Sequence, residues 1–301
     1  MSSPWPWHFV SLSEDEILRR RDLLDLRGSY AQWSILAAII VIRIYRFSST
    51  ASAPTLKPRR GPTSWLDLPL VSGSIETRRQ YLICGTWLVW LLSLSVWNSG
   101  DERTQSNKNM PDYLHLTKAM AHIALSQIPL QVLMSPAAYI SSTKPSAASM
   151  VSVLTSLPQS TLTPYHRLFG RVVISALLLG HAILYLSFFV QSSHPEFGSL
   201  LLKRVRDSDV QCGLVAISMV VSILLYVRPR AAVSKGALSS SSPLGSMQDR
   251  RRSFYAGHVL LVLGLCLAAY FHVAYAQFYM LQALGAFVVN GVCSWVMVQR
   301  S

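Results

Sequence analysis

Two apolar stretches decide the fold of this chain. Residues 165–186 read YHRLFGRVVISALLLGHAILYL, and residues 255–275 read YAGHVLLVLGLCLAAYFHVAY. Each is about as long as the roughly 20 residues that a helix needs to cross the hydrocarbon layer of a bilayer. The only Lys or Arg residues in them, Arg167 and Arg171, lie near one end of the first stretch. Both stretches are therefore predicted to be membrane-spanning helices.

Working outward from these two stretches, the chain contains seven apolar segments of similar length. They fall roughly at residues 30–46, 80–98, 115–137, 166–190, 210–228, 255–275 and 277–298. The last two are nearly continuous, so a tight turn is expected near Ala276–Gln277. The predicted fold class is all-α: a polytopic membrane helical bundle with about seven transmembrane helices.

The overall composition excludes an ordinary soluble protein. Hydrophobic residues make up 51% of the chain and charged residues 14%, and the mean hydropathy is +0.34. A soluble protein carries about 25% charged residues, so this chain lacks the charge to cover itself in water. The net charge of +13 comes from Lys and Arg that mostly flank the apolar segments. This pattern favours anionic lipid headgroups as partners and argues against nucleic acid.

Basic residues in alternate loops predict the orientation. The loops at 47–80 and 229–254 hold more Lys and Arg than the loops on the other side, although the N-terminal run Arg19–Arg21 opposes this bias. We therefore expect an external or lumenal N-terminus and a cytoplasmic C-terminus, in the plasma membrane or an endomembrane. Residues 47–75, 141–164 and 233–247 are rich in Pro, Ser and Lys and are interpreted as connectors.

Four of the eight histidines form two widely spaced pairs. His166 and His181 are fifteen residues apart, and His258 and His272 are fourteen apart. In an α-helix these spacings correspond to about 21–23 Å and nearly whole numbers of turns. Each helix is therefore expected to present one imidazole near each membrane face, on roughly one side. Both helices cross in the same direction, so as neighbours they would bring His166 level with His258 and His181 level with His272.

Two facing imidazoles are the axial ligands of a b-type haem, and helical bundles hold such cofactors between facing helices. Two haems stacked along the helices would form a path for electrons through a layer about 30 Å thick. The alternative is that the histidines are hydrogen-bonded packing residues, but polar groups in hydrocarbon are costly and usually functional. Zinc is less favoured because histidines fourteen residues apart on one helix cannot share an ion. A transporter with inverted repeats lacks matching broken helices in the two halves.

Four arginines near the predicted inner pair are candidates for holding haem propionates. These are Arg167, Arg171, Arg251 and Arg252, although membrane-anchoring positive charge explains them equally well. His122 has no partner at either spacing and is interpreted as a packing residue or an indirect support of the site. His8, His115 and His194 are given no role.

The paired histidines and their flanking residues resemble the ferric reductase-like transmembrane family, which includes fungal metalloreductases and NADPH oxidases. The resemblance rests on His166-Arg-x-x-Gly170-Arg171, on HAILY from His181, and on Arg252-Ser-Phe-Tyr-x-x-His258 with His272. The preceding stretch HIALSQIPLQVLMSP is similar to the helix before the first haem helix of fungal members. Residues 76–97 resemble a fungal subgroup with an additional leading helix, related to the TmpA-type membrane flavoproteins.

The resemblance implies a six-helix bis-haem core and one-electron transfer from a cytosolic flavin to an external acceptor such as a ferric chelate or oxygen. His166 and His258 would hold the inner haem, and His181 and His272 the outer haem. It divides the chain into an N-terminal non-membrane segment at 1–29, leading helices and loops at 30–110, and the haem-binding transmembrane domain at 111–301. Family members normally continue into a domain that binds FAD and NADPH, whereas this chain ends at MVQRS. We therefore expect an oxidoreductase component that cannot oxidise NADPH by itself. Either a separate cytosolic flavoprotein reductase supplies its electrons, or the chain is a shortened product whose FAD- and NADPH-binding domain is missing.

The fifteen-residue spacing departs from the fourteen that is usual in the family. The additional residue would turn His181 by about 100° away from the haem, unless a local π-bulge absorbs it. Without such a bulge the outer haem would be lost. The second hypothesis for function is accordingly a haem-free or degenerate membrane protein with a structural or regulatory partner role.

Overall fold

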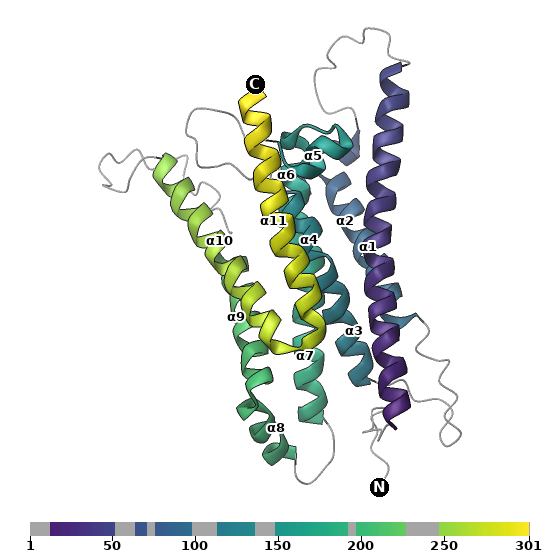
Figure 1. The fold of residues 1–301 in the computed structure, drawn as a ribbon, viewed down its shortest axis with the longest axis vertical. Helices are drawn as coiled ribbons and strands as arrows, with labels where there is room; N and C mark the ends of the chain where they lie inside the picture. Colours follow the sequence, from purple (N-terminus) through teal and green to yellow (C-terminus); the bar gives the residue numbers. More distant parts are fainter. Residues whose placement is uncertain are drawn as a thin grey trace.

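The computed structural model describes residues 13–51, 64–70, 76–97, 113–135, 148–191, 197–226 and 247–300. Within these residues every regular element is a helix, apart from one isolated bridge between Pro69 and Thr77. Long helices run roughly along one axis of the molecule, and the N-terminus and the C-terminus lie at opposite ends (Figure 1). The chain is an all-α, polytopic membrane protein, as the sequence predicts.

The first part of the chain forms a long helix and a shorter one beside it. Helix α1 (Glu14–Ala51) begins well before the predicted segment at 30–46, because residues 14–29 continue the same helix. A short 3-10 turn, η1 (Trp65–Asp67), precedes α2 (Arg78–Val96). Thr77 begins α2 with a capping box, in which its side chain accepts from the Gln80 N–H and the Gln80 side chain accepts from the Thr77 N–H.

The third predicted segment is broken into two helices. Helix α3 (Tyr113–Ser126) ends before Gln127, and α4 (Ile128–Leu133) follows at once with Pro129 in its first turn. Proline is tolerated there because the first N–H groups of a helix have no intrahelical partner. The end of α4 leaves backbone carbonyls without a helical partner, and one of them has a role in the candidate site.

Part of the predicted connector at 141–164 is helical, which corrects that interpretation. Helix α5 (Met150–Thr155) begins at Ser149, whose hydroxyl accepts from the Ser152 N–H. Side chains from α11 complete this corner: the Asn290 carbonyl oxygen accepts from the Met150 N–H at 2.7 Å, and the Ser294 hydroxyl donates to the Ala148 carbonyl at 2.9 Å. These contacts join residues about 140 positions apart, so the local composition gave no sign of them.

The remaining helices include both that carry the histidine pairs. Helix α6 (Gln159–Leu168) continues through the π-helical segment η2 (Phe169–Ile174) into α7 (Ser175–Gln191). Helix α8 (Phe197–Arg206) is short and amphipathic, and α9 (Ser208–Tyr226) follows it. Helix α10 (Met247–His272) leads into α11 (Ala274–Arg300). The turn between these two lies at Val273 rather than at the predicted Ala276–Gln277, because α11 begins at Ala274 and continues through both of those residues.

Five of the described helical stretches are long and apolar enough to cross a membrane. They are Glu14–Ser49, Gln159–Ser187, Ser208–Leu225, Ser253–His272 and Ala274–Met297. The apolar core lies among α2, α3, the α6–η2–α7 helix and α11, where Leu91, Ile123, Leu168, Val173 and Leu177 are fully buried. Many large apolar side chains of α9, α10 and α11 point outward instead, as expected for helices in contact with lipid.

Candidate functional site

The four paired histidines lie on two helical rods that run in the same direction. His166 and His181 belong to the continuous α6–η2–α7 helix, and His258 and His272 belong to α10. Both rods run from the end of the molecule shared with the C-terminus towards the end shared with the N-terminus (Figure 1). Helix α7 packs mainly on α3, whereas α10 packs mainly on α9 and α11.

A π-helical segment separates His166 from His181, as the fifteen-residue spacing requires. In this segment the Ser175 N–H donates to the Gly170 carbonyl five residues earlier, and the Ser175 hydroxyl donates to the same oxygen at 2.7 Å. A π turn holds one residue more than an α turn, so it absorbs one additional residue without rotating the helix beyond it. The local π-bulge that could absorb the additional residue is therefore present.

His166 and His258 face each other across the two rods. Their ring centroids are 6.4 Å apart, and their planes are nearly perpendicular at 82°. Phe254 stacks on His258 one turn earlier on α10, with 5.8 Å between ring centroids. The Nδ1 atom of His258 is buried and has no hydrogen-bond partner among the residues that the structure describes. A buried nitrogen without a partner is costly unless a bound group or a water satisfies the ring.

The other three histidines donate one ring N–H to a backbone carbonyl. The Nδ1–H of His166 donates to the Gln131 carbonyl at 3.0 Å, that of His181 to Thr117 at 2.8 Å, and that of His272 to Asp209 at 2.6 Å. A carbonyl oxygen can only accept, so the proton of each ring is on Nδ1. This fixes the tautomer and the orientation of each ring, and it leaves Nε2 with a free lone pair for a metal.

The Gln131 carbonyl is available because α4 ends immediately after it. Ser135 N–H bonds to Val132 rather than to Gln131, so the Gln131 oxygen is left for His166. The Gln131 side chain also donates to the His166 carbonyl at 2.8 Å. Gly170 makes room for this side chain, because an added Cβ would lie 2.8 Å from Gln131 Nε2. The broken α3–α4 helix and the π segment thus position His166 together.

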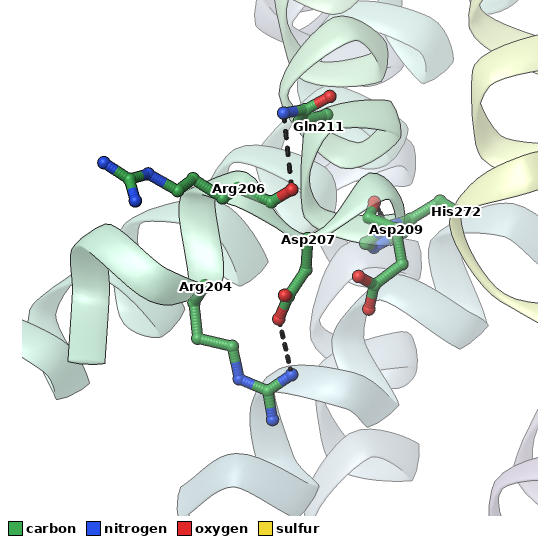
Figure 2. Close-up of polar contacts among 6 residues, drawn as sticks. All are labelled: Arg204, Arg206, Asp207, Asp209, Gln211 and His272. Atoms are coloured by element: carbon green, nitrogen blue, oxygen red, sulfur yellow. Dashed lines mark hydrogen bonds and ion pairs between the residues drawn. The ribbon is translucent and has the colours of Figure 1, made fainter.

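The second pair lies at the end of the molecule shared with the N-terminus. His272 is the last residue of α10, and Figure 2 shows its ring beside Asp209 in the first turn of α9. A Cβ on Gly213 would lie 2.7 Å from the His272 ring, so only glycine leaves space for this approach. His272 is near enough to His181 for the two imidazoles to interact electrostatically.

Polar contacts fix the start of α9 next to His272. Arg204 donates to the Asp207 carboxylate at 3.1 Å, and the Gln211 side chain donates to the Arg206 carbonyl at 3.5 Å (Figure 2). These contacts join the end of α8 to the first turn of α9. They hold the Asp209 carbonyl where the His272 ring can reach it.

The four arginines that the sequence suggests as propionate partners differ in their surroundings. Arg167 is exposed and adjacent to His166. Arg171 donates to the Tyr81 hydroxyl at 3.0 Å and lies 3.9 Å from the Glu76 carboxylate, so it contacts the start of α2. Arg251 and Arg252 are in α10, but their side chains lie outside the described residues.

Two buried polar clusters were not predicted from the sequence. Arg27 is fully buried, and its guanidinium donates to the Trp97 carbonyl and contacts His115 Nε2 at 3.0 Å. His122, interpreted as a packing residue, contacts both Tyr279 and Asp25. The sequence feature that could have indicated these two clusters is the run of charged residues just before the apolar part of α1. Within the described residues, no group of three or more His, Cys, Asp and Glu side chains could hold a free metal ion.

Comparison with known families agrees with this geometry. The family model described as "Ferric reductase like transmembrane component" matches residues 120–293, a range that contains all four paired histidines. The chain belongs to this ferric reductase-like transmembrane family. No curated protein matched the chain, and no solved structure matched it either. Membership agrees with an integral, multi-pass membrane protein and indicates a role in electron transfer across the membrane.

Proposed function

We propose that this protein carries electrons across a membrane through two b-type haems, each bound by one histidine from α6–η2–α7 and one from α10. His166 and His258 would bind one haem, and His181 and His272 the other. The observation that carries this proposal is the His166–His258 pair, whose facing rings are 6.4 Å apart.

This spacing fits a shared iron. Two imidazoles that bind one metal would have ring centres up to about 6.2 Å apart, since each metal–nitrogen bond is about 2 Å and each nitrogen is about 1.1 Å from the ring centre. A shared iron also requires a ring nitrogen that is free to bind it. The hydrogen bonds from Nδ1 to backbone carbonyls leave Nε2 free on three of the four rings. Two haems stacked along the helices further require His166 and His181 to lie on one side of their helix, and the π segment supports this arrangement.

When bound, the haems would supply one-electron chemistry between Fe(III) and Fe(II). The protein would hold the rings, exclude water with the apolar surfaces of the helices and so tune the reduction potential. Arg167, Arg251 and Arg252 are proposed to pair with propionates of the inner haem. Arg171 would join them only by leaving Tyr81 and Glu76.

We propose a separate cytosolic flavoprotein as electron donor, and an external ferric chelate as acceptor, with superoxide formation from oxygen as the competing reaction. The donor would approach the end that carries His166 and His258. The acceptor would approach the end that carries His181 and His272.

Difference absorption spectra test this proposal. Protein purified after haem-replete expression is expected to show a b-type spectrum in the dithionite-reduced minus oxidised state, with about two haems per chain by pyridine haemochrome. His166→Ala or His258→Ala should remove one haem, and His181→Ala or His272→Ala the other. His122→Gln is the matched control, because it alters a membrane-buried histidine outside both pairs and should keep both haems. Protein without haem would refute the proposal and favour a haem-free partner role.

A further inference from the structure

A buried cluster at the junction of α1, α3 and α11 is not used by the proposed electron path. His122 on α3 is 6% exposed, and its Nε2 lies 3.0 Å from the Tyr279 hydroxyl and 3.2 Å from the Asp25 carboxylate. The His122 and Tyr279 rings meet edge to face, with 5.0 Å between centroids. These three side chains come from positions 25, 122 and 279, so the fold alone brings them together.

One ring nitrogen with two oxygen partners can form two hydrogen-bonded states. In the first, Nε2 is unprotonated and accepts from the Tyr279 hydroxyl. In the second, Nε2 carries a proton and donates it to the Asp25 carboxylate, as an imidazolium would. The second state holds one proton more than the first, so the cluster is suited to take up and release a proton.

Asp25 connects this buried histidine to water. Its side chain is 60% exposed, whereas His122 and Tyr279 are buried. A proton can therefore enter at the Asp25 carboxylate and pass to His122 without an exposed imidazole. Gly28 preserves the arrangement, because an added Cβ would collide with the Tyr279 hydroxyl and lie 3.0 Å from the His122 ring.

The cluster is next to the histidine pair nearer the N-terminus. Thr117, whose carbonyl holds the His181 ring, lies five residues before His122 on α3. Five residues of α-helix span about 7.5 Å. A charge on His122 would therefore lie on a neighbouring turn of the helix that holds the His181 ring, in a protein interior where charges are screened less than in water.

We infer that His122 is a redox-linked proton site, which takes up one proton through Asp25 when the haem at His181 and His272 is reduced. This inference rests on the proposed function. When bound, the haem at His181 and His272 would accept one electron, and one proton from water on the same side would convert the His122 imidazole to imidazolium. Both charges leave when an external acceptor removes the electron. The uptake offsets the negative charge that the electron adds to a water-poor site.

Other charged or titratable groups surround the cluster, and they must be separated from His122 in any test. They are Asp22 and Arg21 on α1, Lys118 and His115 on α3, Tyr275 on α11, His181 on α7, and the buried Arg27 on α1. Asp22 is the best control among them. It is exposed and one turn from Asp25, and removing its charge leaves both contacts of His122 Nε2 intact.

Redox titration of the full-length haem-loaded protein at several pH values tests this inference. In the wild type, the midpoint potential of the haem lost in His181→Ala should fall as pH rises, with a slope approaching about 59 mV per unit for one proton per electron. His122→Gln and Asp25→Asn should flatten this slope while keeping both haems, and Asp22→Asn should retain it. Reduced-minus-oxidised infrared spectra with labelled histidine should show an imidazole band that His122→Gln removes.

Two results would overturn the inference while leaving the proposed function intact. One is a wild-type protein with two haems and a potential independent of pH. The other is a wild-type slope that persists in both His122→Gln and Asp25→Asn. A protein that contains no haem would refute the proposed function itself, and the inference with it.

Discussion

At the residue scale, the four paired histidines differ in the hydrogen bond that orients each ring. His166, His181 and His272 each donate from Nδ1 to a backbone carbonyl, while Nδ1 of His258 has no such partner. The rings with a carbonyl acceptor are fixed before any ligand binds. Glycine makes this geometry accessible at Gly170 and Gly213, where a side chain would meet Gln131 or the His272 ring.

Gly28 allows a test of the space that a glycine leaves for a neighbouring side chain, with the stability of the protein as the measured quantity. Its missing side chain makes room for the Tyr279 hydroxyl, so Gly28→Ala should destabilise the protein by about 1–3 kcal/mol through overpacking. An added Cβ at Gly285 meets no atom within 4 Å. Gly285→Ala should accordingly be neutral or stabilise α11 by up to about 1 kcal/mol. Thermal unfolding of both variants in detergent measures the difference, and equal melting temperatures would contradict this account of Gly28.

At the element scale, the π segment η2 decides whether the two histidines of the first rod share a side. An uninterrupted α-helix would rotate the fifteenth residue about 100° beyond the fourteenth. The segment from Phe169 to Ile174 absorbs this rotation. The end of α4 has a related effect, because it leaves the Gln131 carbonyl, which a longer helix would bond internally, for the His166 ring.

Changing the length of η2 by one residue tests this role. Deletion of Val172 should convert the π turn to an α turn and leave His181 facing its partner, so both haems should be retained. Insertion of one alanine after Val172 adds a residue that the single π turn cannot also absorb. The insertion should therefore remove the haem bound by His181 and His272 and keep the other. Haem quantitation and difference spectra report the outcome, and retention of both haems in the insertion variant would contradict the assignment.

At the scale of the whole molecule, helix α1, which precedes the residues that match the family, is joined to the rest of the bundle by polar side chains. Gln32 donates to the Gln282 side chain at 2.6 Å, and Arg27 joins the end of α2 to the start of α3 through Trp97 and His115. A fully buried arginine is rare unless it is paired. We therefore interpret α1 as an integral part of the bundle.

Orientation is a prediction at this same scale, since it depends on the distribution of charge over all loops. Ser13, just before α1, and Ser160, in the first turn of α6, are exposed, and these two helices begin at opposite ends of the molecule (Figure 1). In intact cells, a membrane-impermeant maleimide should label Ser13→Cys and leave Ser160→Cys unlabelled, whereas permeabilised cells should show labelling of both. If the protein is in an endomembrane, sealed vesicles replace the cells. The reverse pattern would place the N-terminus in the cytoplasm and reverse the proposed direction of electron flow.

The sequence by itself was sufficient for the membrane class, the helical fold, the family resemblance and the four histidine positions. These follow from helical spacing and apolar length, which are properties of one continuous stretch of chain. The sequence left open whether a π-bulge absorbs the fifteenth residue, and the structure shows that it does. The sequence misplaced the turn at Val273 by three residues, since residues on both sides of that turn are equally apolar. It also treated α5 as part of a connector, because its stabilising partners Asn290 and Ser294 are on a distant helix.

Only the tertiary structure decided which groups surround each histidine. The carbonyls of Gln131, Thr117 and Asp209 lie 35, 64 and 63 positions from the rings that they orient. The Asp25 and Tyr279 contacts of His122 come from almost opposite ends of the chain. Spacing along a single helix carries no information on such contacts, because they depend on how separate helices pack and on where glycine or a helix break lets them approach.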